Sequence, residues 1–173
     1  MRRFHPLLGL TVLVALLASP ALASANPGPF VRHQLARVKT ANEKYRDVNV
    51  ALAHGYQATQ TCVEDPSLGA MGYHYYNPQL GDDPRLLKLY PEFLLYLPTD
   101  TGGLRLGGVE YYRPDADQDL STDSDRPTLF RRHFNGPMYG HFPGQPIHFD
   151  LHVWLFMKNP AGVFARYNPA ASC

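Results

Sequence analysis

Residues 147–156 place three side chains that can bind a metal or transfer a proton on one face of an expected β-strand. His148, Asp150 and His152 alternate with apolar residues, and successive side chains of a strand point to opposite sides of the sheet. Two imidazoles and a carboxylate on one face suit a divalent metal ion or proton transfer. The segment therefore supports a hypothesis about a site, although it does not identify a substrate.

Two further segments offer ligands of the same kind in strand-like, aromatic-rich surroundings. His74 lies within residues 72–76, among glycine and tyrosines, and Glu110 lies within residues 108–112, beside valine and tyrosines. A carboxylate in such surroundings is costly unless it is paired, hydrogen-bonded or bound to a metal. We therefore include both side chains among the candidate ligands.

The spacing of the strand histidines limits how many of them can share one ion. His148 and His152 are four residues apart, roughly 13 Å along a strand, so one ion binds both only if the strand bends. Asp150 lies near each of them and is predicted to be a ligand or a partner that fixes a histidine tautomer. The predicted ligands are, in order of preference, His74, Glu110 and His152, then His148 as the fourth ligand, and Asp150.

Two imidazoles and one carboxylate form the minimal set for a divalent ion that keeps open positions, and Zn, Cu, Mn and Fe all fit it. The main hypothesis is a divalent-metal-binding protein, which as an enzyme would activate water or dioxygen for a small substrate. Two alternatives stay open. One is a metal-free module that binds a small ligand in a Tyr-rich pocket, and the other is a structural envelope-associated protein whose histidines form a hydrogen-bond network.

Residues 1–25 have the features of a secretory signal peptide. Arg2 and Arg3 precede an apolar run over residues 7–17, and small residues follow that offer cleavage sites. The run is too short for a membrane anchor. We predict cleavage after Ala25, with Ala23 as the alternative, and hence a periplasmic or extracellular protein without a membrane span.

The only two cysteines, Cys62 and Cys173, both follow the expected cleavage site. In an oxidising compartment such a pair predicts a disulfide. The bond would tie the last residue to the early part of the domain and contribute roughly 4–5 kcal/mol in the chain-entropy model. Two thiolate metal ligands are the alternative.

Residues 26–173 are enough for a single domain. Without Arg2 and Arg3 the formal net charge changes from +1 to −1, since 14 basic side chains then face 15 acidic ones. A near-neutral balance without a basic stripe argues against binding to nucleic acid or to an anionic membrane surface. The expected partner is a small molecule or a metal ion, and the sequence does not indicate the oligomeric state.

The elements that must position these side chains form an expected α+β domain, with an N-terminal helix packed on a curved, mainly antiparallel sheet. Apolar residues recur every three or four positions over residues 31–52, which predicts one helix that stops at Gly55. Two loops are expected to cover the site, and His141 in the second is interpreted as an exposed residue or a general acid or base. The expected strands are residues 56–63, 70–76, 91–97, 104–112 and 146–158, and the loops are residues 113–127 and 135–146.

Two local expectations concern side-chain facing. Strict alternation over residues 70–76 places Met71 on the face opposite to His74. Gly107 and Gly108 predict a bulge or a close backbone approach, which leaves the facing of Glu110 open.

The segments GAMGYHY (69–75), LGGVEY (106–111) and HFDLHVWL (148–155) resemble a family of small exported bacterial proteins of unknown function. The ending, NPAGVF (159–164) followed by an Asn-Pro pair and Cys173, is similar to the same pattern. The resemblance covers nearly all of the chain after the signal peptide. It implies one compact domain and carries no established activity.

Overall fold

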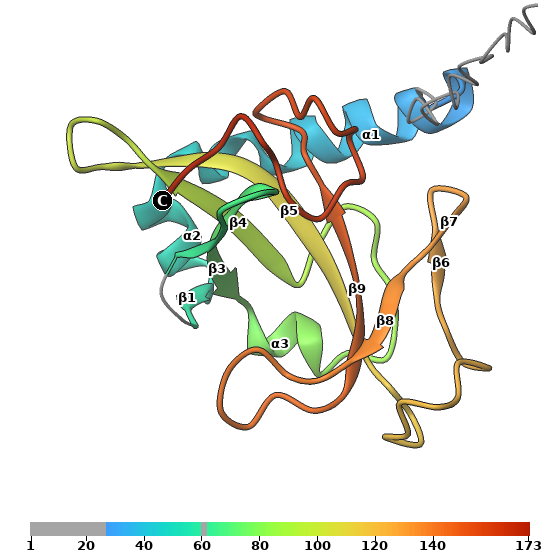
Figure 1. Cartoon of the computed structure of the whole chain (residues 1–173). Coiled ribbons are helices and arrows are strands. Elements are labelled where there is room, and N and C mark those ends of the chain that lie inside the picture. The colour runs from blue at the N-terminus through green and yellow to red at the C-terminus, as the bar shows by residue number, and fades with distance from the viewer. Residues whose placement is uncertain (1–26, 60–61) are drawn as a thin grey trace, which may run out of the picture.

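The computed structural model describes residues 27–59 and 62–173, and the predicted signal peptide lies outside them (Figure 1). The helical elements are α1 (Pro29–Asn42), η1 (Glu43–Arg46), α2 (Val48–Ala53) and α3 (Pro78–Gly81). The strands are β1 (Gln57–Ala58), β2 (Val63–Asp65), β3 (Gly69–Tyr76), β4 (Phe93–Pro98), β5 (Leu104–Pro114), β6 (Thr128–Leu129), β7 (Arg132–His133), β8 (Asn135–Met138) and β9 (His148–Val153). Within the described ranges, no helix is both long and apolar enough to span a bilayer.

Seven of the described strands form one sheet in the order β1-β3-β4-β5-β9-β8, with β2 added to β3. Every pairing in it is antiparallel. β6 and β7 form a separate two-stranded ribbon. The predicted α+β fold with a mainly antiparallel sheet is confirmed.

The N-terminal helical region covers one face of this sheet (Figure 1). Its apolar stripe packs into a single buried cluster with side chains of the central strands. Because Val109 and Tyr111 of β5 belong to that cluster, the alternation of the strand turns Glu110 to the opposite face. The helix side thus holds the main apolar core, formed by Val31, Leu35 and Val38 of α1 with Leu94, Tyr96, Val109, Tyr111, Phe149, Leu151 and Val153.

The expected single helix is present as three consecutive helical segments. At the end of α1 the buried Asn42 side chain donates hydrogen bonds to the carbonyls of Val38 at 2.8 Å and Leu89 at 3.3 Å. Asp47 has an extended backbone and starts α2 by accepting a hydrogen bond from Asn49 N at 2.9 Å. Such side-chain bonds compete with continued helix, so the chain bends around the core instead of running straight.

The predicted bulge in β5 is confirmed at Gly107. Leu95 pairs with Gly108 and Tyr96 pairs with Leu106, so Gly107 has no partner on β4. Its carbonyl instead accepts hydrogen bonds from the backbone of Phe156 at 3.0 Å and from Met157 at 3.1 Å. After the bulge the register is regular, and this fixes the facing of Glu110.

Two expected strands are shorter than predicted. β9 ends at Val153, because the Trp154 amide donates to the Val163 carbonyl at 2.8 Å and the chain leaves the sheet. The strand expected over residues 56–63 is represented by β1 and the start of β2, while residues 60 and 61 lie outside the described part of the chain.

The disulfide between Cys62 and Cys173 is confirmed, with 5.8 Å between the Cα atoms and a sequence separation of 111. The Cys173 amide also donates a hydrogen bond to a carboxylate oxygen of Glu64 at 2.6 Å. The C-terminal segment is thereby fixed against the β2 edge. In Figure 1 this segment, drawn in red, crosses in front of the sheet.

A Cys62→Ser/Cys173→Ser variant is expected to be less stable, because the unfolded chain regains the freedom that closure of this long loop removes. The expected loss in free energy of unfolding is about 4–5 kcal/mol, which lowers the midpoint of thermal unfolding by about 10 °C or more. Circular dichroism melts of the oxidised wild type, the reduced wild type and the variant measure this. Coincident melts of all three would contradict the stabilising role of the bond.

Candidate metal centre

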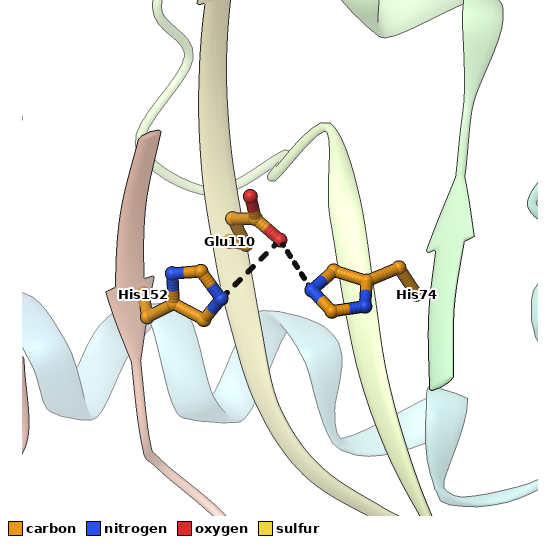
Figure 2. A group of neighbouring side chains, drawn as sticks. All are labelled: His74, Glu110 and His152. Atoms are coloured by element: carbon orange, nitrogen blue, oxygen red, sulfur yellow. Dashed lines mark ion pairs between the residues drawn. The ribbon is translucent and has the colours of Figure 1, made fainter. Parts of the chain in front are cut away.

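Three strands contribute the side chains of the candidate site, His74 from β3, Glu110 from β5 and His152 from β9 (Figure 2). Glu110 and His152 are direct cross-strand partners, which places their side chains next to each other on one face. β4 separates β3 from β5, and there Phe93 lies opposite Glu110. The His74 ring packs edge-on to the Phe93 ring, with 6.1 Å between centroids, and so reaches Glu110 across that strand.

The Oε2 atom of Glu110 lies between the two imidazoles. It is 3.3 Å from Nε2 of His74 and 3.7 Å from Nε2 of His152. One ligand atom from each of the three residues falls within 4.8 Å of the others. Ligands that each lie about 2.0–2.2 Å from one tetrahedral ion are about 3.4 Å apart, so the observed spacing fits a single metal ion.

All three side chains are buried, and three polar atoms of Glu110 and His152 lack a hydrogen-bond partner among the described residues. Glu110 is 3 % exposed and His152 is 1 % exposed. Oε2 of Glu110 and both ring nitrogens of His152 form no hydrogen bond with any described residue. Buried polar atoms are nearly always hydrogen-bonded, and a bound metal ion is one accepted reason for an exception.

Burial also sets the protonation of the group. It lowers the pKa of His74 to about 3, with the neighbouring His152 acting in the same direction. Burial raises the pKa of Glu110 above its usual value, while His152 opposes the shift. For His152 burial acts downward, but the carboxylates of Glu110 and Asp150 outweigh it and raise the pKa. His74 is therefore a neutral imidazole at pH 7, the form that binds a metal.

The structure places the other predicted ligands in a second group. His148 and Asp150 are fully buried and join His141, with one ligand atom of each within 4.8 Å of the others. His148 is thus not the fourth member of the first group, because it lies four residues before His152 on the extended β9. Asp150 connects the groups, since its Oδ1 lies 3.6 Å from Nδ1 of His152.

Sequence reasoning assigned no metal role to His141. This residue lies in the loop between β8 and β9, where no strand or helix periodicity predicts facing. Its ring meets the His148 ring edge-on, with 5.1 Å between centroids. The available signal was its position seven residues before His148 in a segment of glycines and prolines, a segment that has to fold back along the strand that follows.

A cavity of about 150 Å³ opens onto both groups. Met71 lines it beside His74, although strict alternation predicted opposite faces. That expectation was wrong, because Met71 is the extra residue of a bulge between β2 and β3, and Gly72 beside it has a φ of +95°. The lining residues are Val63, Met71, His74, Glu110, His141, Asp150, His152, Arg166 and Tyr167.

Comparisons of the chain with protein-family models, with curated proteins and with solved structures find no match.

In the metal-free protein, the rings of His74 and His148 are expected to stay neutral down to about pH 5, because burial lowers their pKa to about 3 and about 4. His148 is expected to carry its proton on Nδ1, which lies 3.1 Å from the Pro146 carbonyl. Long-range ¹H–¹⁵N correlation spectra recorded between pH 8 and pH 5 after chelation report both properties. A titration midpoint above pH 6 for either ring, or an Nε2–H tautomer of His148, would contradict this description.

Proposed function

We propose that this protein is an exported divalent-metal-binding protein in which His74, Glu110 and His152 bind one ion. The observation that carries the proposal is the buried Oε2 of Glu110, which lies between two imidazole nitrogens and accepts no hydrogen bond from a described residue. A divalent cation at this position would compensate the carboxylate charge and use the nitrogen lone pairs.

The surroundings of His152 support the same assignment. Its Nε2 faces Glu110 at 3.7 Å, while its Nδ1 faces Oδ1 of Asp150 at 3.6 Å. Histidines that bind a metal commonly direct their other ring nitrogen toward a carboxylate or a carbonyl, which orients the ring. Asp150 is itself oriented, because Nδ2 of Asn135 donates a hydrogen bond to its Oδ1 at 2.9 Å.

Three protein donors leave coordination positions open toward the cavity. This ligand set suits Zn, Cu, Mn or Fe. A divalent ion with open positions supplies Lewis acidity toward a water, dioxygen or small-molecule ligand. The cavity of about 150 Å³ restricts any such ligand to a small molecule, and a metal-dependent enzyme acting on a small substrate is the catalytic form of the proposal.

The two metal-free alternatives account less well for the site. A structural hydrogen-bond network requires donors for the Glu110 carboxylate, and no described residue donates a hydrogen bond to its Oε2. The contact between Nδ1 of His152 and Oδ1 of Asp150 is 3.6 Å long. A Tyr-rich pocket requires several tyrosines at the cavity, whereas Tyr167 is the tyrosine among the described lining residues.

Export is the second part of the proposal. The signal-peptide features of residues 1–25 support it, and so does the disulfide between Cys62 and Cys173, since such bonds persist mainly in oxidising compartments. The resemblance to small exported bacterial proteins agrees with this location.

Glu110→Gln is the direct test, because glutamine keeps the shape of the side chain and removes the negative charge. Loss of a residue that only orients a metal ligand lowers metal affinity about 10- to 100-fold. Because Glu110 is a proposed ligand itself, the variant is expected to lower the affinity of the tightest zinc-binding step by more than this. Competition for zinc against a chromophoric chelator at pH 7 measures the affinity, and circular dichroism verifies the fold.

Glu43→Gln is the matched control, because Glu43 is exposed in η1 and its one ion pair among the described residues is with Arg46. It is expected to bind zinc like the wild type. Equal affinity of wild type and Glu110→Gln would overturn the proposal. So would a wild-type protein that binds none of zinc, copper, manganese and ferrous iron.

A further inference from the structure

The group formed by His141, His148 and Asp150 has the properties of a second metal site. His148 and Asp150 are 0 % exposed and lie two residues apart on β9, so both face the same side of the sheet. His141 approaches them from the loop before β9, and one ligand atom of each residue lies within 4.8 Å of the others. Two imidazoles and a carboxylate therefore converge here for a second time.

His148 is held in the tautomer that binds a metal through Nε2. Its Nδ1 lies 3.1 Å from the Pro146 carbonyl oxygen, which can only accept, so Nδ1 carries the hydrogen. Nε2 is then left with its lone pair, and this buried atom has no hydrogen-bond partner among the described residues. A ring nitrogen bonded to a carbonyl, with the other nitrogen open, is the usual arrangement of a metal-binding histidine.

Asp150 has one oxygen in use and one open. Its Oδ1 accepts the hydrogen bond of Asn135 and faces His152. Its Oδ2 is buried and has no hydrogen-bond partner among the described residues. An ionised carboxylate oxygen in such a position is costly without a positive partner. Oδ2 of Asp150 and Nε2 of His148 are thus two buried atoms of this group that can each provide a lone pair to a metal ion.

The two groups lie on opposite sides of the His152 ring. Nε2 of this ring faces Glu110 in the first group, and Nδ1 faces Asp150 in the second. An imidazole rather than a single shared oxygen therefore stands between the two positions. Two ions held in this way would be further apart than the about 3.5–4 Å typical of two-metal hydrolytic centres.

We propose that His141, His148 and Asp150 form a second divalent-metal site that opens onto the same cavity as the first. This inference goes beyond the proposed function and does not require the first site to be filled. The second site binds its ion more weakly, because His141 is exposed on a loop and the cation Arg166 lines the same cavity. Its ion is the exchangeable one.

Equilibrium dialysis of the full mature chain against zinc chloride, followed by elemental analysis, tests this proposal. The wild type is expected to bind about two equivalents, and His141→Ala about one, with the loss confined to the weaker step. His141→Ala preserves the fold because the side chain is exposed and the backbone amide still donates to Gln145. His33→Ala, which removes an exposed histidine of α1, is expected to keep both equivalents.

Glu110→Gln separates the two proposals, since it is expected to lose the tight step and keep the weak one. One equivalent in both the wild type and His141→Ala would overturn the second site and leave the proposed function standing. A wild type that binds a single equivalent, which His141→Ala loses and Glu110→Gln keeps, would support the second site and overturn the first. No zinc bound to the wild type would overturn both.

Discussion

A carboxylate removed from water needs a positive partner or a proton, and Glu110 places this requirement on the side of the sheet that faces away from the helices. The cost of burying an uncompensated charge is several kcal/mol even after relaxation. The neutral imidazole of His74 provides only part of the compensation, because burial keeps its pKa low. Asp150, two residues before His152 on β9, is a second buried carboxylate with the same requirement. The proposed sites for divalent cations would compensate both buried carboxylates together.

One face of the sheet packs into the apolar core, and the other face holds the candidate metal ligands. Val109 and Tyr111 pack into the core under α1, while Glu110 between them belongs to the candidate site. The bulge at Gly107 sets this alternation, because one residue more or less in β5 would exchange the two faces. The disulfide then fixes the C-terminal segment beside the cavity, to which Arg166 and Tyr167 contribute.

The residues that meet in the first group were predictable because each lies in a strand-like, aromatic-rich segment, but only the bulge at Gly107 fixes the facing of Glu110. The predictions that were wrong or missing concern features that depend on contacts between distant segments. The helix ends early because Asn42 bonds to the Leu89 carbonyl, 47 residues away. Met71 changes face at a bulge that only the pairing with β2 creates. His141 reaches His148 through the path of a loop, and no local pattern encodes that path.

The central claim is that one ion binds between His74, Glu110 and His152. Crystals grown with zinc, with diffraction data collected on both sides of the zinc absorption edge, test it most directly. The account predicts an anomalous peak about 2.0–2.2 Å from Oε2 of Glu110 and from one ring nitrogen of each histidine. A map that shows zinc elsewhere on the protein, and only water or direct hydrogen bonds between these three side chains, would contradict it.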